Sequence, residues 1–318
     1  MFADNSAING SCIGCDDRPC YQYGEGELDT SPLGGFPTDL NRQVCPTNVV
    51  SPNGDGGFPL IESDGCIMCG VCVLRCPVGA IFIDPAKGAR VVNEDNSRFV
   101  KTEPDSAQAS RTRSDFSGIE RSGIMLLESE PVAKLIGQRS SKALYRNPRY
   151  PNILSRNLLV ALGAKAVTPR AGVASTRMDL LYQTYDGCTG VAEVEFGDEA
   201  VLDAPRDILD DVAILVSRHK WDQSKIKTAI ITDVLPNRRS EFWRLVADIR
   251  NVTGLRIGTM SVLSLMMAVW RGRKLDCKAS DLFYTDESTS TYIATLVDAL
   301  GFEPKLKLGG NRFVDWVK

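Results

Sequence analysis

Apolar residues follow two different patterns along the 318-residue chain. In the first hundred residues they form short stretches broken by Gly, Pro and Cys, and Ala80–Asp84 (AIFID) predicts a strand. From about Ile119 onward they recur at helical spacing or in short buried runs, which indicates alternating helices and strands. The expected elements there are a helix over 152–162, strands over 177–185 and 191–196, a helix over 208–221, a strand over 227–233, a helix from Asn237 or Ser240 to about 251, a strand over 255–258, and helices over 261–270 and 289–300. This order predicts a mixed sheet flanked by helices.

The chain is long for one compact core, so two domains are expected. Residues 93–118 are polar and lack an apolar period, which predicts a linker or a surface excursion. We therefore expect an N-terminal domain over 1–97, a linker over 98–118 and a C-terminal domain over 119–318. Residues 21–65 are rich in Gly and Pro and predict an irregular loop in the first domain. The expected fold class is α/β (α+β).

The net charge of −3 is unevenly distributed. Residues 1–100 carry a net charge of −7, whereas residues 101–178 carry +7. An acidic module repels polyanions, and the basic segment can face them. The alternative is that this segment is simply a solvated charged face. We expect its arginines to form a basic surface beside Glu193, and the candidates are Arg146, Arg149, Arg156, Arg170 and Arg177.

Cysteine use indicates a reducing compartment. Eight of the ten cysteines cluster at metal-ligand spacing, whereas Cys188 and Cys277 are isolated and are expected to be packing residues. The first residues (MFADNSAING) lack the basic and apolar regions of a signal peptide. The longest apolar stretch, Val262–Trp270, is far shorter than the roughly 20 residues of a membrane span. We expect a cytoplasmic protein without a membrane segment.

The most specific motif is the run C-x2-C-x2-C-x3-C-P. It is formed by Cys66, Cys69, Cys72, Cys76 and Pro77. This spacing is typical of bacterial 4Fe–4S proteins, in which the fourth cysteine ligates a second cluster. Four further cysteines supply that second cluster, and they are Cys12, Cys15, Cys20 and Cys45, the last of which is followed by Pro46.

The cysteine of each Cys-Pro pair is therefore expected to be the fourth ligand of the cluster whose other three ligands lie in the other cysteine segment. One predicted set is Cys12, Cys15, Cys20 and Cys76, and the other is Cys66, Cys69, Cys72 and Cys45. The alternative is structural zinc, since four-cysteine zinc sites also use C-x2-C pairs. Zinc needs neither a third cysteine at this spacing nor a Cys-Pro, which favours iron–sulfur. Residues 10–90 resemble two-cluster bacterial ferredoxins, and this resemblance implies electron transfer with a redox partner.

A second candidate site lies in the C-terminal domain. Glu193 and Glu195 alternate with apolar residues in the strand Val191–Phe196, so both carboxylates lie on one face. Asp179 begins the preceding strand and Asp186 lies in the loop between the two strands. Acids from paired strands can converge on a hard cation such as Mg2+, which prefers oxygen ligands. Asp179 is favoured over Asp186 as the third ligand, because Asp is common in hairpin turns for its turn geometry. The alternative is that Glu193 and Glu195 form the solvent face of an edge strand.

Residues 150–270 resemble the PD-(D/E)xK nucleases, whose core is Asp, hairpin, Glu-x-Lys, helix, strand and helix. Glu193-Val194-Glu195 is similar to the Glu-x-Gln or Glu-x-Glu of the Bgl and Bam restriction endonuclease branch. The resemblance implies a restriction-endonuclease-like domain that hydrolyses DNA with Mg2+, bound by Asp179, Glu193 and Glu195. Glu195 departs from the lysine that most members carry.

Two other functions remain open. One is a ferredoxin-type electron carrier whose C-terminal domain is a docking scaffold. The other is a redox sensor that binds DNA without cleaving it.

Overall fold

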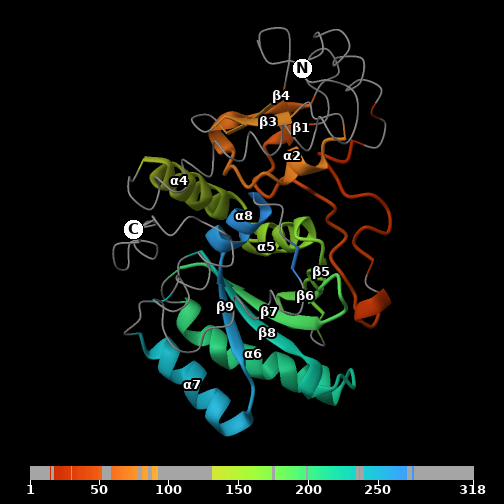
Figure 1. Cartoon of the computed structure of the whole chain (residues 1–318), viewed down its shortest axis with the longest axis vertical. Helices are drawn as coiled ribbons and strands as arrows, with labels where there is room; N and C mark the ends of the chain where they lie inside the picture. Colours follow the sequence, from red (N-terminus) through yellow and green to blue (C-terminus); the bar gives the residue numbers. More distant parts are fainter. Residues whose placement is uncertain are drawn as a thin grey trace. The chain divides into compact units, whose positions relative to one another are not determined.

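The computed structural model describes residues 15, 18–29, 31–51, 59–77, 81–84, 88–91, 131–173, 176–197, 200–233, 236, 240–270 and 274–275 (Figure 1). The expected linker over 98–118 and the expected helix over 289–300 lie outside these residues, as do Cys12 and Cys277.

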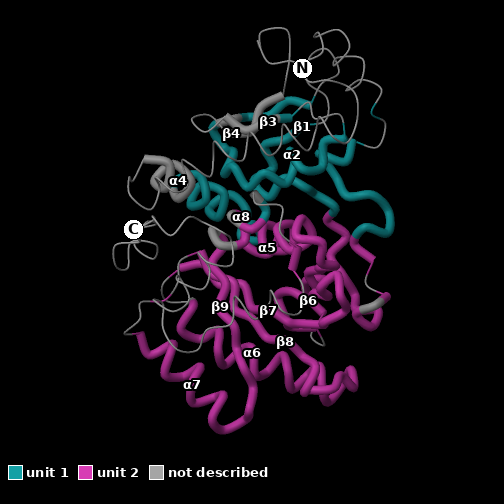
Figure 2. Tube along the Cα trace, viewed as in Figure 1, with its two compact units in different colours: residues 1–27, 42–150, 269–271 teal, residues 28–41, 151–268, 272–318 magenta. Residues whose placement is uncertain are grey.

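The chain divides into two compact units (Figure 2). Unit 1 comprises residues 1–27, 42–150 and 269–271, and unit 2 comprises residues 28–41, 151–268 and 272–318. The main boundary therefore falls after Tyr150, about thirty residues beyond the boundary expected from the polar segment. The segment 28–41 belongs to unit 2 because its backbone pairs there: Asp39 N donates to Thr168 O at 2.9 Å, and Arg170 N donates to Pro37 O at 2.9 Å.

Unit 1 is built from short elements. Two antiparallel pairs occur, β1 (Val50–Ser51) with β2 (Leu60–Ile61) and β3 (Ile81–Asp84) with β4 (Gly88–Val91). Its helices are η3 (Ser63–Gly65), α2 (Val71–Arg75) and α4 (Pro131–Arg146). The predicted strand over 80–84 is confirmed as β3, and the 21–65 segment has only short pieces of regular structure among the described residues.

Unit 2 is organised around a five-stranded mixed sheet in the order β5-β6-β7-β8-β9. The strands are β5 (Lys165–Val167), β6 (Leu180–Gln183), β7 (Thr189–Glu195), β8 (Lys227–Thr232) and β9 (Ile257–Ser261). The first three pair antiparallel, and the β7–β8 and β8–β9 pairs are parallel. The parallel pairs need crossover connections, which the helices between these strands provide. The predicted mixed sheet with helices is confirmed.

The helices of unit 2 are η1 (Ser31–Leu33), α5 (Tyr150–Ala161), α6 (Ala200–Ser217), η4 (Gln223–Lys225), α7 (Glu241–Thr253) and α8 (Val262–Trp270). The first residue of α5 and the last two of α8 are assigned to unit 1. Helix α7 shows why its bounds were predictable. Ser240 Oγ accepts a hydrogen bond from Phe242 N at 3.2 Å at its start, and Gly254 ends it at φ 74°. Among the described helices, none is both long and apolar enough to cross a bilayer.

Helix α6 begins eight residues before the predicted start at Ile208. Pro205 lies inside it and removes one backbone hydrogen bond. Val201, Ala204 and Ile208 nevertheless follow helical spacing and are all buried in the core of unit 2. Burial of this apolar stripe outweighs the lost hydrogen bond, which the local sequence alone does not reveal.

The core of unit 2 lies where α6 contacts β7 and β8 (Figure 1). Val191 in β7 packs in this core with Ile208 and Leu215 of α6. Because side chains alternate along a strand, Glu193 and Glu195 lie on the same face as Val191. The apolar core therefore passes directly into a carboxylate-rich region at the end of β7.

Candidate metal centres

Four cysteines of unit 1 form one group of mutually interacting thiols. Burial raises the pKa of Cys69, and the charges of Cys45 and Cys66 raise it further. Burial also raises the pKa of Cys72, and the charges of four other cysteines raise it further: Cys66, Cys69, Cys45 and Cys20. Cys45 therefore lies with the C-x2-C-x2-C cysteines, although more than twenty residues separate it from them in the sequence.

A second group forms around Cys20. Burial, followed by the charges of Cys76 and Cys15, raises the pKa of Cys20 to about 12. Cys76 thus lies with Cys15 and Cys20, four residues after Cys72 but in the other group. The fourth expected member, Cys12, is outside the described residues.

The loop that carries the cysteines turns its backbone toward the sulfurs. Met68 adopts φ 59° and Gly70 φ 82°, both in the left-handed region. Met68 N donates a hydrogen bond to Cys66 Sγ at 3.4 Å, and Cys69 receives one from Val71. Amide donors favour the charged thiolate form of a cysteine. Burial opposes that form unless iron binds the sulfur. Buried thiols with amide donors fit a bound iron–sulfur cluster.

The sulfur spacing argues against zinc. Tetrahedral zinc with Zn–S bonds of about 2.3 Å holds its sulfurs about 3.8 Å apart. Among the described residues, only a group of carboxylates brings three ligand atoms within 4.8 Å of one another. No three cysteine sulfurs of the described residues lie that close together, whereas a tetrahedral four-cysteine zinc site requires it.

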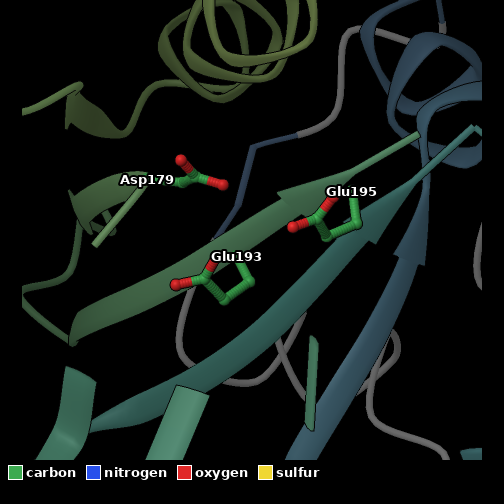
Figure 3. Close-up of side chains that lie close together, drawn as sticks. All are labelled: Asp179, Glu193 and Glu195. Atoms are coloured by element: carbon green, nitrogen blue, oxygen red, sulfur yellow. The ribbon is translucent and has the colours of Figure 1, made fainter. Parts of the chain in front are cut away.

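That carboxylate group consists of Asp179, Glu193 and Glu195 (Figure 3). Glu193 and Glu195 project from β7, and Asp179 directly precedes β6. Asp179 is held in place through both oxygens, since Oδ2 accepts from Val194 N at 3.0 Å and Oδ1 accepts from Asn152 Nδ2 at 2.9 Å. The three acids predicted from the sequence are therefore brought together.

The surroundings of this triad disfavour three negative charges. Glu193 is only 6 % exposed, and burial raises its pKa strongly, helped by Asp211 and Asp179. The pKa of Glu195 is raised to about 7. Burial is the largest cause, and the charges of Asp179, Asp207 and Asp203 contribute further. A bound cation would offset the negative charge of these clustered carboxylates.

The alternative of an exposed edge strand is wrong for β7. This strand is the central one of the five, and Glu193 pairs in register with Ile230 of β8. Ala192 and Val194, on the opposite face, are buried as well. Buried carboxylates at the centre of a sheet are costly unless they are paired or bind a metal.

Two residues of the site were not anticipated. Asn152, in α5, orients Asp179. Asp211, in α6, is 2 % exposed, shares a hydrogen bond with Glu193, and its Oδ2 has no hydrogen-bond partner among the described residues. Asp211 lies between Ile208 and Leu215 on the apolar face of a predicted amphipathic helix. A charged residue on that face is the sequence feature that could have identified Asp211 as part of the site.

Asp186 does not belong to the triad. It lies in the turn between β6 and β7, where its Oδ1 accepts a hydrogen bond from Thr184 Oγ1 at 2.6 Å. Gly187, next in the chain, adopts φ 98°. Asp186 therefore has the hairpin-turn role that is common for Asp.

Two sequence expectations need correction. Arg156 is not a surface residue, because it is 1 % exposed and donates to Asn41 O at 2.6 Å and to Asn157 Oδ1 at 3.0 Å. Arg149, Arg170 and Arg177 are exposed as expected. Cys188 is not a simple packing residue, because it forms a disulfide bond.

Comparison with known proteins finds relatives for the cluster region. A family model described as a 4Fe-4S binding domain matches residues 59–82. An uncharacterized ferredoxin of Methanocaldococcus jannaschii is 28 % identical over 72 residues, which is 23 % of this chain and 32 % of the relative. The polyferredoxin-like subunit of aliphatic sulfonate oxidoreductase from Pyrococcus furiosus is 29 % identical over 82 residues, which is 26 % of this chain and 35 % of the relative.

The chain thus spans about a third of the length of these relatives. No solved structure matches it. The 4Fe–4S ferredoxin character of the N-terminal part is established by these matches, and nothing in them bears on the carboxylate site.

Proposed function

We propose that the chain is an electron carrier whose unit 1 holds two 4Fe–4S clusters. The observation that carries this proposal is the interleaving of the two cysteine groups, in which Cys45 and Cys76 each join the group of the other segment. The charge of Cys20, in one group, raises the pKa of Cys72, in the other, so the two groups are neighbours.

A bound cluster supplies one-electron redox chemistry. The chain's own residues hold the sulfurs, direct amides toward them and exclude water, all of which tune the reduction potential. The similarity to ferredoxins and to a polyferredoxin-like oxidoreductase subunit supports electron transfer to a partner enzyme.

Anaerobic purification with iron and sulfide analysis tests this proposal. We expect about eight irons and eight sulfides per chain from two four-cysteine ligand sets, together with reversible reduction by dithionite. About four irons, or zinc in their place, would contradict the two-cluster assignment.

A second function is favoured by the carboxylate triad. We propose that Asp179 and Glu193 hold Mg2+ and that Glu195 completes the ligand set or orients a water molecule. A divalent cation in such a site can generate hydroxide and stabilise the transition state of phosphodiester hydrolysis. The order β6, β7, α6, β8, with acids before β6 and on β7, is compatible with the nuclease resemblance. DNA is the proposed substrate, and hydrolysis needs no electron from the clusters.

Plasmid cleavage with Mg2+ tests this function. The wild type is compared with Glu193→Gln, and Asp186→Asn serves as the matched control because Asp186 lies in the adjacent turn. Cleavage by the wild type and by Asp186→Asn, and not by Glu193→Gln, would support hydrolysis. DNA binding without cleavage, altered by cluster oxidation, would instead favour a redox sensor.

A further inference from the structure

A cavity of about 510 Å³ lies within unit 1, beside the residues of one cysteine group. One wall is formed by α4, and the other by the segments that follow Cys45 and precede Cys66. The residues that carry the argument are Thr47, Glu62, Asp64, Arg139, Lys142 and Arg146.

The α4 wall is cationic. Arg139, Lys142 and Arg146 lie three and four residues apart, so they share one face of the helix. Among the described residues, none of the three forms an ion pair, although Glu62 and Asp64 line the same cavity.

Arg139 gives the strongest indication of a ligand. Its side chain is only 7 % exposed, and in the described part of the chain its single hydrogen bond runs from Nη1 to Cys66 O at 2.6 Å. The other guanidinium nitrogens have no partner there. A buried cation without a carboxylate partner is costly, and an oxyanion is the ligand that a guanidinium binds best.

The cavity is also directly connected to the cysteines. Arg139 holds the carbonyl of Cys66, and Cys45 Sγ lies 3.5 Å from the hydroxyl of Thr47, which lines the cavity. A negative charge placed here would lie close to the iron–sulfur ligands. It would disfavour addition of an electron and so lower the reduction potential.

We propose that this cavity binds a small molecule bearing an oxyanion, held by Arg139, Lys142 and Arg146. The opposite acids, Glu62 and Asp64, accept hydrogen bonds from amine or hydroxyl groups at its other end. The cavity is larger than a bare oxyanion needs, which fits such a two-ended ligand. The effect on reduction potential rests on the proposed electron-transfer function, whereas binding itself does not.

The test is isothermal titration of the cluster-loaded, full-length protein at constant ionic strength, with inorganic phosphate as one probe and O-phosphoethanolamine as the other. We expect saturable one-to-one binding of both, with the amine-bearing probe the tighter. Lys142→Gln and Arg146→Gln should each weaken phosphate binding by about tenfold, the effect of one charge-assisted hydrogen bond. Lys165→Gln, an exposed lysine of unit 2, is the control and should leave affinity unchanged.

Glu62→Gln tests the amine end of the ligand separately from the oxyanion end. It should remove the preference for O-phosphoethanolamine and leave the affinity for inorganic phosphate unchanged. A potentiometric titration with and without phosphate then checks the link to the cluster, and we expect the potential to fall on binding. Absence of saturable binding, or equal binding in Lys142→Gln, Arg146→Gln and wild type, would overturn the site. Binding without a shift in potential would retain the site and overturn only its coupling to the cluster.

Discussion

Asp179 Oδ2 accepts a hydrogen bond of 3.0 Å from the backbone N–H of Val194, the residue between the two glutamates of the triad. This bond fixes an acid at the start of β6 against the strand that carries Glu193 and Glu195. The convergence of the three carboxylates is thus built into the strand pairing. Side-chain flexibility alone would not hold them within 4.8 Å.

Glu193→Gln should abolish Mg2+ binding by unit 2 while preserving its fold. Burial already favours the uncharged form of Glu193, so an amide of the same shape is tolerated in the absence of metal. Isothermal titration with Mg2+ and circular dichroism measure the two effects. Asp186→Asn should bind Mg2+ like the wild type, and equal loss in both variants would contradict the assignment.

Asn152→Ala should weaken Mg2+ binding without abolishing it. Asn152 donates to Asp179 Oδ1 and so orients a proposed ligand without contacting the metal. Loss of such an orienting hydrogen bond typically costs about 10–100-fold in metal affinity. Asn147→Ala, which removes an amide from the end of α4 in unit 1, is the matched control for titration of this site. Unchanged Mg2+ affinity in Asn152→Ala would show that Val194 N alone suffices to position Asp179.

Metal-free unit 2 should lose stability as the pH rises. The folded pKa of Glu195 is raised from 4.5 to about 7, so the folded state holds a proton that the unfolded state has released. The contribution of Glu195 to the free energy of unfolding is therefore fully present below about pH 4.5 and is lost as the pH rises through about 7. Urea denaturation followed by tryptophan fluorescence measures this slope. Glu195→Gln should flatten the slope, and added Mg2+ should restore stability at pH 7 and above, because a cation compensates the deprotonated carboxylates.

Much of this site was predictable because it depends on local periodicity. Alternation along a strand places Glu193 and Glu195 on one face, and a hairpin brings Asp179 beside them. Asp211 and Asn152 were missed because they come from helices, whose distance from β7 depends on tertiary packing. Burial of Arg156 was missed for the same reason, since its acceptor Asn41 is 115 residues away in the sequence.

The cysteine grouping was predictable because the spacing motif itself encodes the crossover. The unit boundary was not, since α4 joins unit 1 through contacts such as Arg139 to Cys66 O that span 73 residues. The polar segment before α4 predicted a boundary at that point. Because α4 belongs to unit 1, the boundary lies after α4 instead.

Cys76→Ser should damage the cluster of the Cys15–Cys20 group more than that of its sequence neighbours. Cys76 raises the pKa of Cys20, whereas Cys45 raises the pKa of Cys69 and of Cys72. Electron paramagnetic resonance of the reduced variant should show one altered signal and one retained signal. Cys45→Ser is the reciprocal variant and should alter the other signal. The opposite pattern in the pair would show that each cluster takes all its ligands from one segment.

If DNA is the substrate, exposed arginines of unit 2 should set the salt dependence of binding. Each phosphate that is neutralised contributes about 0.9 to the slope of log affinity against log salt, because condensed counterions are released. Arg170 and Arg177 are exposed, so Arg170→Gln combined with Arg177→Gln should flatten the slope by up to about 2, similarly across DNA sequences. Arg156 is the internal contrast, because it is buried and bonded to Asn41 O. Arg156→Met should lower the free energy of unfolding and leave the salt slope of the remaining folded protein unchanged. A slope that responds to Arg156 and not to Arg170 and Arg177 would contradict a DNA-binding role for these exposed arginines.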